Sequence, residues 1–144
     1  MNKQEAVKLL ALIKVAYPTA YRDMDDASKK ATVNMWANSF PEVPYPIMEQ
    51  AFNHFRMVSK FPPTVAEMVD ELKKIHYQAT EYTMLCASVG NDTDANRYRA
   101  IMEATSRYKD IDSFWGRLNM IDVSNSLTQG SQPYLGWTAN KKRG

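Results

Sequence analysis

Apolar residues recur every three or four positions along most of the chain, which is the pattern of amphipathic helices. Proline, glycine and short polar stretches separate the periodic segments. They predict five helices at about 2–16, 25–39, 46–58, 64–89 and 93–109, with a short helix or packed turn at 111–118. No segment keeps the alternation of a strand, so the expected fold class is all-α. We expect a compact helical bundle of about five helices, with its core helices within residues 1–89.

Two helix starts show the capping-box pattern, in which an N-cap side chain and an acidic side chain three residues later bond to each other's backbone N–H groups. The first pair is Asn2 and Glu5, and the second is Thr64 and Glu67. Two consecutive prolines before Thr64 cannot lie inside a helix, so a sharp corner is expected there. The residues predicted to set the helix boundaries are Tyr17, Pro18, Phe61, Pro62, Pro63, Thr64 and Glu67.

Two aromatic residues mark the second predicted helix. Trp36 and Phe40 follow its apolar spacing, beside Met35. Such a pair could stack on a ligand, but at this spacing we expect both side chains in the core.

Residues that usually carry chemistry are few. His54 and His76 stand alone on separate helices, without a second ligand at metal spacing, and are expected at the surface or its boundary. Cys86 lacks a basic neighbour and is expected as a buried apolar thiol rather than a nucleophile. Asp25 and Asp26 are expected as helix-start charges. The sequence therefore predicts no enzyme, no catalytic residues, no cofactor and no metal site, and a lone cysteine fits a reducing cytoplasm.

The net positive charge of the chain is concentrated at its C-terminal end. From Asn119 onward the chain has Asp122 against Lys141, Lys142 and Arg143, so +3 and −1 give +2, which equals the net charge of the whole chain. Residues 1–118 are therefore neutral, and tight binding to bare DNA is not expected. The fifth helix nevertheless interleaves cations with aromatic rings, which could contact single-stranded nucleic acid or a second partner. Acidic residues flank this face and favour a solvated surface; its residues are Arg97, Tyr98, Arg107 and Tyr108, with Arg99 and Lys109 nearby.

The composition changes after residue 118. Residues 119–144 are rich in serine, asparagine, glutamine and glycine, so we expect a helical domain at 1–118 and a flexible basic tail at 119–144. Tyr134, Leu135 and Trp137 are large apolar residues within this tail. They either remain unused in water or serve as anchors that order on a partner, with Lys141, Lys142 and Arg143 beside them.

The order of several motifs resembles the small phage-encoded replicative helicase loader and inhibitor proteins. Over about residues 5–70 the chain reads Ala16-Tyr17-Pro18, Trp36, Pro44-Tyr45, Ala51 and Phe61-Pro62-Pro63-Thr64-Val65-Ala66-Glu67-Met68. The segment from Phe40 to Pro46 departs from the family, where an acidic turn with fewer prolines is expected.

The resemblance implies a non-enzymatic adaptor with a helical N-terminal domain and a mobile C-terminal part. Such proteins bind the ATP-bound hexameric replicative helicase, restrain its ATPase and unwinding, and deliver it to the origin by contacting the phage's origin-bound initiator. The family's C-terminal segment is associated with helicase contact, and the setting is the host cytoplasm without a membrane partner. Two alternatives stay open: a phage inhibitor of a host enzyme acting by protein contact, and a weak DNA-binding module.

Overall fold

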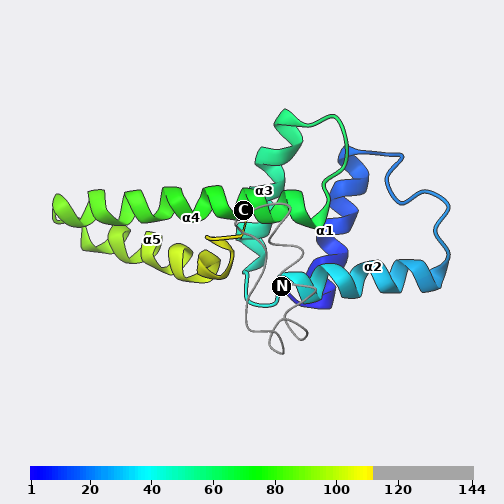
Figure 1. The fold of residues 1–144 in the computed structure, drawn as a ribbon, viewed down its shortest axis with the longest axis horizontal. Coiled ribbons are helices and arrows are strands. Elements are labelled where there is room, and N and C mark those ends of the chain that lie inside the picture. The colour runs from blue at the N-terminus through cyan, green and yellow to red at the C-terminus, as the bar shows by residue number, and fades with distance from the viewer. Residues whose placement is uncertain (112–144) are drawn as a thin grey trace, which may run out of the picture. The chain divides into compact units, whose positions relative to one another are not determined.

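The structure is a computed structural model, and it describes residues 1–111. Figure 1 shows the helices along this part of the chain. They are α1 (Lys3–Ala16), α2 (Asp26–Ser39), α3 (Tyr45–Val58), α4 (Val65–Ser88) and α5 (Asp92–Thr105), followed by the 3₁₀ helix η1 (Ser106–Tyr108). Residues 1–111 contain no strand, and the all-α prediction is confirmed. The turn expected at 111–118 extends beyond the described residues, and the tail expected at 119–144 lies outside them.

Both predicted capping boxes are present. At α1, the Glu5 N–H donates to Asn2 Oδ1 at 2.8 Å and the Asn2 N–H donates to Glu5 Oε1 at 2.9 Å. At α4, Thr64 Oγ1 accepts from the Glu67 N–H at 3.1 Å, and Glu67 Oε1 accepts from the Thr64 N–H at 3.0 Å. Each box satisfies a backbone donor that has no partner inside its helix, which fixes the residue at which the helix begins.

Asp25, predicted as a helix-start charge, is also the N-cap of α2. The Asp25 carboxylate accepts from the Ser28 N–H at 2.7 Å. Bonds from the Ser28 backbone and side chain favour the charged form, and they lower the pKa of Asp25. Asp25 is therefore a helix-start charge.

Most helix boundaries lie within one residue of the prediction, and the end of α5 differs by more. Helix α3 begins at Tyr45, one residue before Pro46. Proline is tolerated there because the N–H groups of the first turn have no acceptor within the helix, so the N–H that proline lacks is not missed. Helix α5 spans Asp92–Thr105 rather than 93–109. The chain tightens into η1 after Thr105, and this turn places Tyr108 in the core.

The core lies between α1, α2, α3 and the first half of α4. Trp36 is 2% exposed and Phe40 is fully buried, so their predicted core role is confirmed. Their ring centroids lie 6.0 Å apart, and the Tyr108 ring lies 5.8 Å from Phe40. The core therefore includes Tyr108 from η1, which follows the first four helices in sequence. Other fully buried side chains are Leu9, Ile13, Val43, Met48, Met68 and Leu72.

The corner between α3 and α4 is held by polar contacts and by one proline. The Tyr17 hydroxyl donates to the Ser59 carbonyl oxygen at 2.8 Å, which ties the end of α1 to the end of α3. The Ser59 hydroxyl accepts from the Phe61 N–H and donates to the Phe61 carbonyl. Pro63 is buried, whereas the Phe61 side chain is 76% exposed. Phe61 therefore shapes the corner through its backbone.

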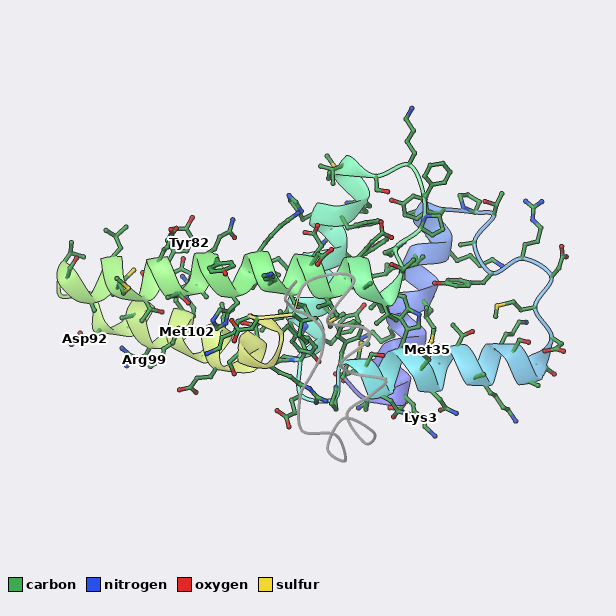
Figure 2. All side chains as sticks on the ribbon, in the orientation of Figure 1. Lys3, Met35, Tyr82, Asp92, Arg99 and Met102 are labelled. Atoms are coloured by element: carbon green, nitrogen blue, oxygen red, sulfur yellow. The ribbon has the colours of Figure 1, made fainter. Side chains whose placement is uncertain are left out.

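Several apolar residues on the predicted helix stripes are exposed. Met35 is half exposed because α2 buries only Trp36 and Ala37, at its C-terminal end. Figure 2 labels Met35 on α2. Val58, the last residue of α3, is exposed just before the chain turns away from the core.

The second half of α4 and all of α5 form a helical hairpin (Figure 1). Gly90 follows α4 with φ at +79°, a conformation that glycine adopts without a steric penalty, and α5 then returns along α4. Within residues 1–111 no helix combines the length and apolar character needed to cross a membrane.

Candidate functional site

Tyr108 does not belong to a nucleic-acid or partner face. Its side chain is 1% exposed, and its hydroxyl donates to the Ser39 carbonyl oxygen at 2.7 Å. Burial raises the pKa of Tyr108 to about 12. A ring enclosed in this way is not available to stack on a base, so its placement on the binding face was wrong. Its neighbour Arg107 is exposed on η1.

Arg97 and Tyr98 form a small cluster on the α4–α5 hairpin. The Arg97 guanidinium lies over the Tyr98 ring, 4.6 Å from its centroid, and an Arg97 nitrogen lies 3.6 Å from an Asp94 carboxylate oxygen. The Tyr98 ring is 5.1 Å from the ring of Tyr82, which Figure 2 labels on α4. Part of the Arg97 charge is therefore balanced within the hairpin. A binding role for Arg97, Tyr98 and Arg107 stays a prediction.

The structure reveals a buried carboxylate that the periodicity did not single out. Glu71, on α4, is 5% exposed, and its Oε1 lies 2.6 Å from Nδ1 of His54 on α3. Its other oxygen accepts from Lys74 Nζ at 3.2 Å. Both carboxylate oxygens are thus engaged, and the bond to His54 holds α3 against α4. His54 and Glu71 are 17 residues apart across the corner, so no local spacing signals their contact.

His76 also departs from its predicted place. It is buried between α4 and α5, with Nδ1 at 3.1 Å from both the Thr105 hydroxyl and the Met102 carbonyl oxygen. Cys86 is half-buried rather than buried. In the part of the chain that the structure describes, no three His, Cys, Asp or Glu residues gather as metal ligands. The contacts of His76 join α4 to α5.

A groove lies between α1 and α2 and has a volume of about 400 Å³. Its lining is mainly apolar and comes from α1, the loop before α2, and α2 itself. The lining residues are Val7, Leu10, Ala11, Lys14, Tyr21, Met24, Lys29, Thr32 and Val33. A second hollow of about 390 Å³ shares Val7, Lys29 and Val33 with it and adds Lys3, Lys30 and Asn34. We call the two together the α1–α2 groove.

A further group of exposed apolar side chains lies on the second half of α4. Its members are Tyr77, Tyr82, Met84, Leu85 and Val89. The helix predicted at 64–89 includes this region, but α5 covers only part of it.

The residues predicted to contact a helicase lie outside the described residues. They are Tyr134, Leu135, Trp137, Lys141, Lys142 and Arg143. Their role stays a prediction.

Comparison with known proteins gives one finding. Residues 1–69 match the family model of the N-terminal domain of a phage helicase-loader and inhibitor protein. This range covers α1, α2, α3, the corner and the start of α4. The search of curated proteins and the search of solved structures each returned no match. Over residues 1–69, just under half of its length, the chain is similar to this family of phage helicase-loader and inhibitor proteins.

Proposed function

We propose that this protein is a non-enzymatic adaptor of phage replication. It binds a hexameric replicative helicase in its ATP-bound state, inhibits ATP hydrolysis and unwinding, and helps to load the ring at the origin through contact with an origin-bound initiator. It acts in the cytoplasm of the host. The match of residues 1–69 to the N-terminal domain of the loader family carries the proposal, since that family binds a replicative helicase.

The described part of the chain is suited to an adaptor that holds two partners at a defined separation. The α4–α5 hairpin is tied to the matched domain by the Tyr108–Ser39 bond, and α5 is tied to α4 by His76 and Thr105. Buried polar contacts of this kind favour one arrangement, because breaking one leaves an unpaired group away from water. A body held in this way can present separate surfaces to separate partners.

We assign the helicase contact to the C-terminal segment. This segment contains tyrosine and tryptophan, two of the side-chain types that dominate binding hot spots, at Tyr134 and Trp137, with Leu135 between them. Each hot-spot side chain contributes about 2 kcal/mol or more to the free energy of binding. Lys141, Lys142 and Arg143 would speed the approach to an acidic surface. The composition of residues 119–144 predicts that ordering the segment costs part of this gain. The resulting contact would be reversible, which suits a loader that must release its ring.

Comigration tests this function. The full chain is mixed with the phage's or the host's purified replicative helicase and separated by size-exclusion chromatography with ATP, with ADP or without nucleotide. We expect comigration with the hexamer in ATP and a weaker complex in the other two conditions. A hexameric ATPase from an unrelated pathway serves as the control. Failure to comigrate with either helicase in any nucleotide state would contradict the proposal and favour inhibition of another host enzyme.

A further inference from the structure

The α1–α2 groove is open because the two helices diverge. In Figure 1 the C-terminal end of α2 lies beside the first turns of α1, and the loop between the helices spans their other ends. The burial pattern agrees, since Trp36 and Ala37, both near the C-terminal end, are the buried residues of α2. The first half of α2 therefore lies away from α1 and leaves the adjacent surface of α1 uncovered.

The surface left between the helices is apolar. Val7, Leu10 and Ala11 contribute the α1 wall, Val33 contributes the α2 wall, and Met24 closes the end near the loop. Val7 is 52% exposed, and Leu10 and Ala11, one turn further along α1, line the same groove. Covering this apolar surface with apolar side chains of a partner would be favourable, because it removes the surface from water.

One wall of the groove is held in place by an unusual backbone. Tyr21 has φ at +59°, in the left-handed region that residues with a side chain rarely adopt. Its ring is half-buried against the core and lines the groove, and burial raises the pKa of Tyr21. The loop before α2 thus contributes an aromatic side chain to the lining of the groove.

The rim of the groove is basic. Lys14 and Lys29 line the main hollow, and Lys3, Lys29 and Lys30 line the adjoining one, while neither lining includes a carboxylate. The ion pairs found within residues 1–111 join His54 and Lys74 to Glu71, and Arg97 to Asp94. All four lysines of the rim are thus outside the ion pairs of the described chain. Figure 2 labels Lys3 at the lower end of α1, near α2.

We propose that the α1–α2 groove is a docking site for an acidic amphipathic helix of a partner protein. Apolar side chains spaced three and four residues apart along such a helix would enter the groove, and flanking carboxylates would meet the four lysines. The volumes of about 400 and 390 Å³ suit a few large side chains rather than a whole helix. This surface is separate from the proposed helicase contact and does not depend on it.

Charge argues against two other occupants. Residues 119–144 of this chain have one acidic and three basic side chains, so docking them would bring like charges together. A second copy related by a two-fold axis would place the lysine rims against each other. Like-charge contacts of this kind oppose association.

The test uses synthetic peptides of about 18 residues that form amphipathic helices. Four acidic peptides have Leu, Ile, Phe or Trp on the apolar face and Glu on both flanks, and four basic peptides have Lys in place of every Glu. Binding to the full chain is measured by fluorescence anisotropy, with peptide-induced amide shifts mapped by NMR. The rim-reversed variant, Lys14→Glu/Lys29→Glu, reverses the charge at two of the four rim lysines. The control Arg99→Glu/Lys109→Glu makes the same change of net charge at exposed residues outside the groove, and circular dichroism confirms that both variants fold.

At least one acidic peptide should bind and shift amides lining the groove, and the basic peptides should bind at least about tenfold more weakly. Rim reversal should weaken acidic-peptide binding by about tenfold or more, and the control should change it by less than about twofold. Absence of binding by all four acidic peptides up to about 1 mM, or equal binding to the rim-reversed variant, would overturn the proposal. Two results would also overturn it in favour of another occupant: binding that appears only when residues 119–144 are removed, or a dimer that dissociates on rim reversal. Loss of helicase comigration would leave this result unaffected, so the two proposals fail separately.

Discussion

The Tyr108 hydroxyl donates to the Ser39 carbonyl oxygen at 2.7 Å and joins η1 to the last residue of α2. Tyr108 lies beyond the matched range of residues 1–69, whereas Ser39 lies inside it. The same ring packs 5.8 Å from Phe40. The core of the matched range is therefore completed by a residue that follows it in sequence.

Replacing Tyr108 by phenylalanine should destabilise the chain by about 1 kcal/mol, because it leaves the Ser39 carbonyl without its donor and keeps the ring packing. Urea denaturation followed by circular dichroism measures the change. Tyr77→Phe is the matched control, since Tyr77 is exposed on α4 and should shift stability by less than about 0.5 kcal/mol. Equal stability of the two variants would show that the hydroxyl bond contributes nothing.

Alkaline pH should weaken the fold through the same residue. Burial raises the pKa of Tyr108 to about 12, while an unfolded tyrosine ionises near 10. As pH rises, the phenol proton of Tyr108 is lost from the unfolded chain before it is lost from the folded chain. The contribution of the protonated phenol to the free energy of unfolding is therefore fully present below about pH 10 and is lost as pH rises through about 12. The difference in urea midpoint between the parent and Tyr108→Phe should therefore narrow across this interval. A constant difference would contradict the buried, protonated phenol.

Trp36→Ala should cost about 3–5 kcal/mol, the usual effect of removing a buried aromatic side chain. The side chain is 2% exposed and packs on Phe40. Met35→Ala, one residue earlier, removes a half-exposed side chain and should cost much less. Chemical denaturation of both variants compares them directly, and a Trp36→Ala variant as stable as the parent would disprove the core assignment.

Thr64→Ala should cost about 1 kcal/mol through loss of the cap on α4. The substitution removes the acceptor of the Glu67 N–H bond and leaves that backbone donor to water. Thr93→Ala provides a comparison within the first turn of another helix, where the threonine is exposed and is not the N-cap. Indistinguishable thermal midpoints for the two variants would remove the capping box from the account of the corner.

Local chemistry explains which parts of the fold the sequence could predict. The caps at Asn2 and Thr64 and the helix-start charge of Asp25 depend on residues that are close in sequence. The apolar period of a helix can likewise be recognised from that helix alone. These features located five helices and the corner. The end of α5 was missed because it depends on Tyr108 reaching Ser39, 69 residues away.

The surface was less predictable for the same reason. His54 meets Glu71, and His76 meets Thr105, only after the helices have packed. The α1–α2 groove depends on how far the two helices diverge, and the apolar period of each helix does not predict the angle between them. The apolar period marked Met35 as an inward position, but the helices within residues 1–111 leave its side chain half exposed.

The central claim is that the chain restrains a replicative helicase through its C-terminal segment. The most direct measurement is the ATPase rate of the helicase hexamer titrated with the full chain, with the chain ending at residue 118, and with Trp137→Ala. Circular dichroism checks that the shortened chain keeps its helical body. We expect the full chain to inhibit, the shortened chain to lose most of this inhibition, and Trp137→Ala to reproduce much of the loss, since one aromatic anchor often contributes about 2 kcal/mol or more. Undiminished inhibition by the shortened chain would contradict the account and place the helicase contact on the helices.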